Sequence, residues 1–182
     1  MEKNPVKIIL FGLNNSGKSS IALCLQRKNN LSYFTSLAPT RDHNIISFKD
    51  QKSNMRISIW DFGGQKRHRK QHLERLADEF SIGVSKLIYV IDIQDEERYE
   101  LSLEYFQEIL KELEKIKNNL RISVFLHKYD PNLEFNEQKI TNLISKINGL
   151  IPKQFQHNIY KTSIYTIFFF FFINLSNSIF HR

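Results

Sequence analysis

The chain has 182 residues, 41% of them hydrophobic and 25% charged, which fits one compact domain and excludes a disordered chain. Its single cysteine excludes a disulfide framework and a cysteine-based zinc site. The formal net charge of +7 allows acidic partners, such as nucleotides, anionic lipids or acidic protein surfaces, without choosing among them.

Short apolar runs and amphipathic segments alternate along the chain. In chain order, the pattern predicts a strand at residues 6–11, a helix at 19–28, strands at 45–48 and 55–60, a strand at 87–93, a helix at 99–116, a strand at 122–126, a helix with its apolar face at 140–147, and a strand at 159–162. The polar turn 50–54 makes an antiparallel hairpin of the second and third strands, and Asn148-Gly149 is expected to end the last helix. Alternating strands and helices predict an α/β fold, with a mostly parallel sheet, one antiparallel strand and helices on both faces.

A phosphate-binding motif lies between the first strand and the first helix. The segment Gly12-Leu13-Asn14-Asn15-Ser16-Gly17-Lys18-Ser19 matches G-x-x-x-x-G-K-[ST] in the context that the mechanism requires. Its glycines let the backbone turn N–H groups toward phosphate oxygens, and the helix N-terminus adds partial positive charge. Lys18 is expected to reach the β- and γ-phosphates, and the Ser19 hydroxyl to bind Mg²⁺. The residues of this segment expected to contact a nucleotide are Asn14, Asn15, Ser16, Gly17, Lys18, Ser19 and Ser20.

A second motif, Trp60-Asp61-Phe62-Gly63-Gly64-Gln65, follows the third strand. Asp61 is expected to hold the Mg²⁺ shell through water, and the N–H of Gly64 to contact a γ-phosphate, since glycine admits a close approach. Gln65 is the candidate catalytic residue, because its amide can orient an attacking water. With this motif the chain resembles the Ras superfamily of small GTPases, in which W-D-x-G-G-Q begins switch II of the Arf-like and Rag-like branches.

The segment Ala38-Pro39-Thr40 resembles switch I of Arf-like GTPases. The resemblance implies that the Thr40 hydroxyl binds Mg²⁺ when a triphosphate is bound. Thr35 is the nearest alternative for this role, and the position of Thr40 in the sequence favours Thr40.

Base recognition is expected at His127-Lys128-Tyr129-Asp130, which is similar to the N-K-x-D motif of small GTPases. The resemblance implies that Asp130 accepts hydrogen bonds from guanine N1–H and its amino group, and that the Lys128 stem lies over the base. His127 stands where most members have Asn. H-K-x-D resembles the Rag (Gtr) branch, as do Leu87-Ile88-Tyr89-Val90-Ile91-Asp92 and Thr162-Ser163-Ile164-Tyr165. In that pattern the backbone of Ser163 and Ile164 meets guanine O6.

The resemblance spans residues 7–165 and places the chain in the Arf/Rag branch without deciding between the two. It implies a GTP-binding switch that binds GTP or GDP with Mg²⁺, hydrolyses GTP slowly, and meets an exchange factor, an activating protein and effectors at its switch regions. The alternative is a non-hydrolysing, nucleotide-bound scaffold that acts as an interaction protein. Asp130 argues against an ATP-dependent enzyme, and nothing in the sequence indicates a nucleic-acid partner.

Residues 1–165 are interpreted as the G domain and residues 166–182 as a Phe-rich tail. Three interpretations of the tail stay open: a last helix on the sheet, an anchor for a membrane or partner, or translated non-coding sequence. No signal peptide is recognised, and neither an Arf-type myristoyl site nor a C-terminal cysteine is present, so we expect a cytoplasmic protein. A peripheral contact with an endomembrane and a second GTPase subunit stay open, although the second domain by which Rag proteins pair is not expected after the last strand.

The basic run Lys66-Arg67-His68-Arg69-Lys70-Gln71-His72 follows Gln65 directly. We interpret it as the solvated face of a switch II helix. Docking of an acidic partner or anionic lipid is the alternative, and an arginine of this run acting on the γ-phosphate is a further one.

Overall fold

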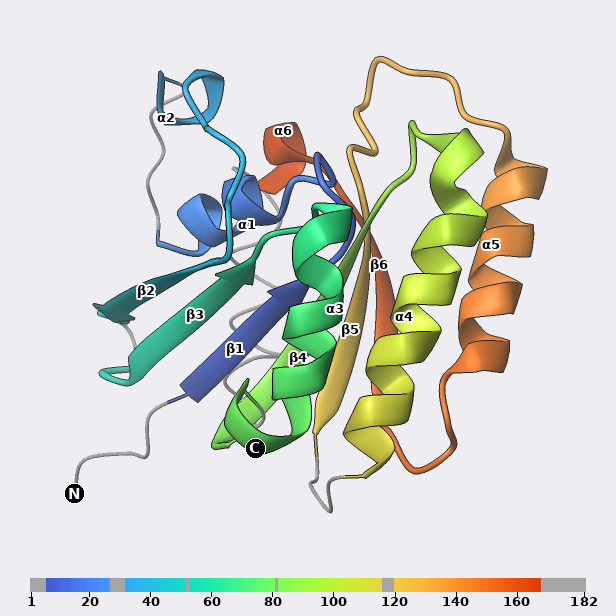
Figure 1. Cartoon of the computed structure of the whole chain (residues 1–182). Coiled ribbons are helices and arrows are strands. Elements are labelled where there is room, and N and C mark those ends of the chain that lie inside the picture. The colour runs from blue at the N-terminus through green and yellow to red at the C-terminus, as the bar shows by residue number, and fades with distance from the viewer. Residues whose placement is uncertain (1–5, 27–31, 52, 81, 116–119, 168–182) are drawn as a thin grey trace.

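A six-stranded sheet forms the centre of the molecule in the computed structural model, which describes residues 6–26, 32–51, 53–80, 82–115 and 120–167 (Figure 1). The strands are β1 (Val6–Phe11), β2 (His43–Lys49), β3 (Arg56–Phe62), β4 (Val84–Asp92), β5 (Arg121–His127) and β6 (His157–Thr162), in the order β2-β3-β1-β4-β5-β6. The β2–β3 pair is antiparallel, and the other four pairs are parallel. The predicted fold class is confirmed.

Helices cover both faces of the sheet (Figure 1). They are α1 (Lys18–Leu25), α2 (Ser32–Thr35), α3 (Lys66–Arg75), α4 (Tyr99–Glu114), α5 (Glu137–Leu150) and α6 (Ile164–Ile167). Figure 1 shows α3, α4 and α5 on one face, and α1 and α6 on the other. A π-helical turn (Leu76–Phe80) follows α3, and a 3₁₀ turn (Glu96–Arg98) leads into α4.

The central strands β1, β4 and β5 are largely continuous apolar runs because both of their faces are buried. Successive side chains of a strand point to opposite faces. In β1, Ile9 and Phe11 therefore join the core beneath α4 and α5, whereas Ile8 and Leu10 join the core that contains α1 residues. The predicted apolar face of α4 is buried, and its residues are Leu103, Phe106, Ile109, Leu110 and Leu113.

Two predicted helix ends were wrong. The first helix begins at Lys18 and ends at Leu25. The α5 helix passes through Asn148-Gly149 and ends at Leu150, ahead of Pro152. Glycine stays helical at modest cost, about 1 kcal/mol relative to alanine, and the buried Ile147 keeps this last turn on the core.

The α3 helix is absent from the order predicted by hydrophobic periodicity, and only the interpretation of the basic run anticipated it. Its exposed cations Lys66, Arg67 and Lys70 form the expected solvated face. His72, by contrast, is fully buried. A helix that buries a histidine instead of an aliphatic stripe gives little periodic signal.

The Phe run 168–172 lies outside the described residues, so the three interpretations of the tail stay predictions. Within the described residues, no helix is both long enough and apolar enough to cross a membrane.

Candidate functional site

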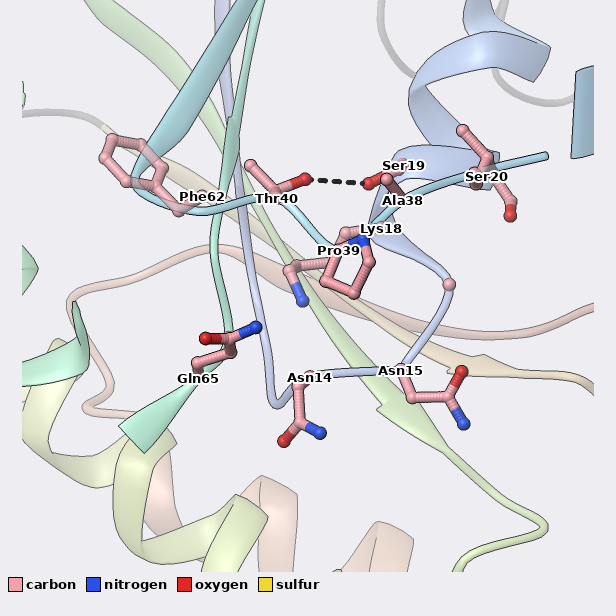
Figure 2. A pocket seen from close by; sticks show the side chains of 13 residues that line it. Asn14, Asn15, Lys18, Ser19, Ser20, Ala38, Pro39, Thr40, Phe62 and Gln65 are labelled. Carbon is pink, nitrogen blue, oxygen red and sulfur yellow. Dashed lines mark hydrogen bonds between the residues drawn. The ribbon is translucent and has the colours of Figure 1, made fainter. Parts of the chain in front are cut away.

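The predicted site residues gather at one edge of the sheet. The carboxyl ends of parallel strands meet at the same edge, and the loops that follow them form a crevice there. A cavity of about 210 Å³ opens at this edge, between the loop after β1, residues 37–40, and the segment after β3 (Figure 2). Asn14, Asn15 and Ser20 line it, whereas Ser16 is buried behind the loop.

Lys18 is a buried cation at the floor of this cavity. Its ammonium donates to the backbone oxygen of Leu13 at 2.7 Å, and Lys18 is only 5% exposed. Burial lowers the pKa of Lys18 to about 8, and the nearby Asp61 carboxylate opposes this shift. A cation in this setting gains most from an anion that enters the cavity.

Three oxygen-bearing side chains from separate segments converge beside Lys18. The Ser19 hydroxyl donates to Asp61 Oδ2 at 2.5 Å and lies 3.2 Å from the Thr40 hydroxyl, which also donates to Asp61 Oδ2 at 3.2 Å. Figure 2 shows the Ser19 and Thr40 hydroxyls facing each other. The other carboxylate oxygen, Asp61 Oδ1, is buried and makes no hydrogen bond within the described residues.

These hydroxyl and carboxylate oxygens are the ligand types that Mg²⁺ prefers. Burial raises the pKa of Asp61, while the Ser19 hydrogen bond and Lys18 oppose the shift. A divalent cation at this place would stabilise the charged form of the buried Asp61 carboxylate. Thr40, the predicted threonine, is brought to this cluster. Its alternative, Thr35, is the last residue of α2.

Gly64 packs directly on the phosphate-binding loop. A Cβ atom built at Gly64 would lie 2.2 Å from the carbonyl carbon of Leu13 and 2.3 Å from the amide nitrogen of Asn14. The amide of Asn14 donates to the Gly64 carbonyl oxygen at 3.1 Å. No larger residue fits at this position without moving the loop.

Gln65 is half-buried at the start of α3 and lines the same cavity. Its backbone oxygen accepts hydrogen bonds from the amides of His68 and Arg69, at 2.9 and 3.3 Å, so the helix fixes its position. In Figure 2 its side chain lies on the same side of the opening as Asn14.

Asp42 connects the segment before β2 to α3. Its carboxylate lies 2.7 Å from His72 Nε2 and 2.9 Å from His43 Nδ1, and its backbone oxygen accepts from the amide of Gly63 at 2.7 Å. Burial lowers the pKa of His72, and the Asp42 hydrogen bond opposes this shift. These contacts link the segment before β2 to both the end of β3 and α3.

Asp130 lies on the loop after β5, at the other end of the site. One carboxylate oxygen accepts from the Ser163 hydroxyl, and the other accepts from Gln94 Nε2 at 3.0 Å. Ser163 is fully buried and directly precedes Ile164, the first residue of α6. The Lys128 ammonium binds Asp92 Oδ2 at 2.6 Å.

His127 lies between the two ends of the site. It is 1% exposed, and its Nδ1 lies 2.9 Å from the Thr162 hydroxyl. A Cβ atom on Gly17, which has a φ of 92°, would lie 2.3 Å from the His127 ring. Burial and the neighbouring Lys128 lower the pKa of His127 to about 4, against the opposite effect of Asp130, so the ring is neutral at pH 7. The ring supports the phosphate-binding loop from beneath.

Sequence reasoning missed three residues of the site, all around the turn after β4. Asp92 binds Lys128, Gln94 binds Asp130, and Arg98 Nη1 lies 3.2 Å from Asn14 Oδ1. Asp92 ends the run 87–92, for which the family resemblance implies no role of this carboxylate. Polar residues that directly follow a buried strand were the available signal, because this strand end lies at the edge that bears the site.

The arginines of the basic run take other positions. Arg69 lies over the ring of Tyr105 in α4, 5.3 Å from its centroid, which packs α3 on α4. Arg67 donates from Nε to His68 Nε2 at 3.0 Å, on the exposed side of α3.

Comparisons with known proteins show the family to which the chain belongs. Residues 7–171 match the Gtr1/RagA G protein conserved region. The chain is 33% identical over 131 residues to GTP-binding protein GTR1 of Saccharomyces cerevisiae, covering 70% of this chain and 40% of that protein. It is 36% identical over 131 residues to GTP-binding protein gtr2 of Schizosaccharomyces pombe, covering 69% and 38%. The chain thus spans about two fifths of the length of these two relatives.

Arf-like proteins are also similar to the chain. ADP-ribosylation factor-like protein 8c of Arabidopsis thaliana is 27% identical over 140 residues, covering 77% of this chain and 70% of that protein. Among solved structures, the Arl6 BBS3 small GTPase of Trypanosoma brucei with bound GppNp has a TM-score of 0.67 at 17% identity, over 96% of this chain and 99% of that one. The mammalian SRP receptor has a TM-score of 0.70 at 13% identity, over 88% and 92%. At these identities the structural likeness shows the fold.

Proposed function

Because the chain belongs to the Gtr1/RagA G protein family, we propose that it is a molecular switch that binds GTP or GDP with Mg²⁺ and hydrolyses GTP slowly. The observation that carries the proposal is the convergence of Ser19, Thr40 and Asp61 beside the buried Lys18. These residues come from three segments, namely the first turn of α1, the loop before β2 and the end of β3, and a triphosphate with its metal ion would give all three segments a common partner.

Mg²⁺ would be held by the Ser19 and Thr40 hydroxyls, and by Asp61 through water. When bound, the ion neutralises the charge of the phosphates. Asp61 Oδ1, buried without a hydrogen bond in the described residues, supports a cation at this place. Lys18 would exchange the Leu13 carbonyl for phosphate oxygens, which would raise its pKa again.

The base would lie against the loop after β5. Asp130 would accept the two guanine donors, and the Lys128 stem would cover the base. The backbone of Ser163 and Ile164 would meet guanine O6, and His127 would keep the loop Gly12-to-Lys18 in place below the phosphates.

The switch would operate through Thr40 and Gly64. Thr40 lies beside Ser19, and Gly64 packs on the phosphate-binding loop, so both segments would sense a γ-phosphate. The contacts of Asp42 with Gly63 and His72 would couple the two segments. Exchange factors, activating proteins and effectors would read this surface in the cytoplasm or at an endomembrane, and another GTPase subunit is a further proposed partner.

Single-turnover hydrolysis of bound GTP tests the proposal. The unmodified chain should hydrolyse GTP slowly, and Gln65→Leu should bind GTP with nearly unchanged affinity while hydrolysing it about 10-fold to 100-fold more slowly, because the water-orienting amide is lost. Gln71→Leu, an exposed glutamine of the same helix, is the matched control.

Each outcome has a distinct meaning. Tight GTP binding without hydrolysis in the unmodified chain, even with an activating protein, would favour the scaffold alternative. Equal hydrolysis rates in the Gln65 and Gln71 variants would remove Gln65 from the mechanism.

A further inference from the structure

Both carboxylate oxygens of Asp130 have hydrogen-bond donors from within the chain. The Ser163 hydroxyl donates to Oδ1, and Gln94 Nε2 donates to Oδ2 at 3.0 Å. The two donors approach from different elements, since Ser163 follows β6 and Gln94 follows β4. The carboxylate is thus held at both oxygens.

A carboxylate offers about four acceptor positions, two on each oxygen. Among the described residues, Ser163 and Gln94 use one position on each oxygen, so one position on each remains for a ligand. Guanine presents two adjacent donors, N1–H and the 2-amino group. The two protein donors therefore fix the rotation of the carboxylate and leave it the acceptor pair that guanine requires.

Gln94 is itself held in place. Its Nε2 also donates to the Lys128 carbonyl oxygen at 2.8 Å, and its backbone amide donates to Asp92 Oδ1 at 3.0 Å. The other oxygen of Asp92 binds the Lys128 ammonium at 2.6 Å. Two hydrogen bonds from Gln94 and one ion pair from Asp92 thus join the end of β4 and its turn to the loop after β5.

The geometry points to Gln94 as a positioning residue for guanine recognition, which aims the Asp130 carboxylate at the base. This inference rests on the proposed function, in which Asp130 reads guanine. Gln94 is exposed, so water competes for its amide, and the effect of losing it is moderate.

The test compares GTP with inosine triphosphate, which lacks the 2-amino group and offers Asp130 a single donor. Dissociation constants are measured by calorimetry for the full chain with Mg²⁺, for both nucleotides and ATP. Gln94→Ala should weaken GTP binding about 3-fold to 10-fold, and inosine triphosphate binding by less, so their affinity ratio falls. Gln94→Glu should lower the ratio further, because a second carboxylate beside Asp130 disfavours its charged form.

Glu97→Ala, at an exposed position of the same turn, is the matched control and should keep the ratio of the unmodified chain. The same ratio in Gln94→Ala, Gln94→Glu and the control would overturn the inference, and so would tighter GTP binding in Gln94→Ala, which would mean that the amide competes with the base. If the unmodified chain itself does not prefer GTP to ATP, the proposed function fails instead.

Discussion

The two ends of the site are built in different ways. At the phosphate end, buried groups and glycines bring backbone segments into direct contact, as Gly64 does on Leu13 and Asn14. At the base end, hydrogen bonds between side chains around Asp130 join the segments instead, on a half-exposed loop.

This difference has an energetic consequence. Polar contacts in a buried setting are stronger, and more costly to break, than contacts that water can replace. We therefore expect the phosphate end to supply most of the affinity for any nucleotide, and the base end to supply the discrimination between bases.

The largest expected effect is that of Lys18→Ala. Loss of this buried cation should weaken binding of every nucleoside triphosphate by about 3–5 kcal/mol, a hundredfold or more, since the phosphates lose a desolvated partner. The factor should be the same for GTP, inosine triphosphate and xanthosine triphosphate when measured by calorimetry. Lys111→Ala, at an exposed position of α4, is the control. A factor that depends on the base would break the separation of the two ends.

A smaller and selective effect is expected from Asp130→Asn. Asparagine turns one acceptor into a donor that faces the guanine amino group, at a cost of about 1–3 kcal/mol in GTP affinity, about 5-fold to 150-fold. Xanthosine triphosphate carries an oxygen there and should bind more tightly than it binds the unmodified chain. Competition binding checks both changes, with Asp78→Asn, at an exposed position, as the control. Unaltered preference among GTP, ATP and xanthosine triphosphate would remove Asp130 from base recognition.

Sequence reasoning predicted the phosphate end better than the base end, for a physical reason. Close backbone approach requires glycines at fixed spacing, so Gly12, Gly17 and Gly64 leave a readable motif. The contact of Gln94 with Asp130 joins residues 36 positions apart through two flexible side chains, and no local spacing encodes it. The position of His127 beneath Gly17 likewise depends on the packing of two loops.

The strands were likewise easier to predict than the helices. Six strands were predicted within a few residues of their observed bounds. In the central strands β1, β4 and β5, burial on both faces demands continuous apolar runs. The α3 helix was invisible to periodicity, since its buried side includes His72, and tertiary contacts with Asp42 hold it in place. Helix ends were missed because Gly149 continues the helix.

The last expected effect is one of pH on stability, and it concerns His127, which contacts both ends of the site. Its folded pKa of about 4 lies below the ordinary histidine value of 6.5. The unfolded chain therefore takes up a proton near pH 6.5, while the folded ring resists it down to about pH 4. The contribution of His127 to the free energy of unfolding is thus fully present above about pH 6.5. It is lost as the pH falls from about 6.5 toward 4, by about 2 kcal/mol between pH 7.5 and pH 5.

Urea unfolding at the two pH values, with saturating GDP and Mg²⁺, measures this loss. Because asparagine does not titrate, His127→Asn should lose about 2 kcal/mol less than the unmodified chain between pH 7.5 and pH 5. His157→Asn, a histidine of β6 that lies away from the junction of the two ends, should keep the loss of the unmodified chain. An equal loss in both variants would show that acid acts elsewhere. A reduced loss in His127→Asn alone would place the acid-sensitive contact between Gly17 and Thr162, where the phosphate end meets the base end.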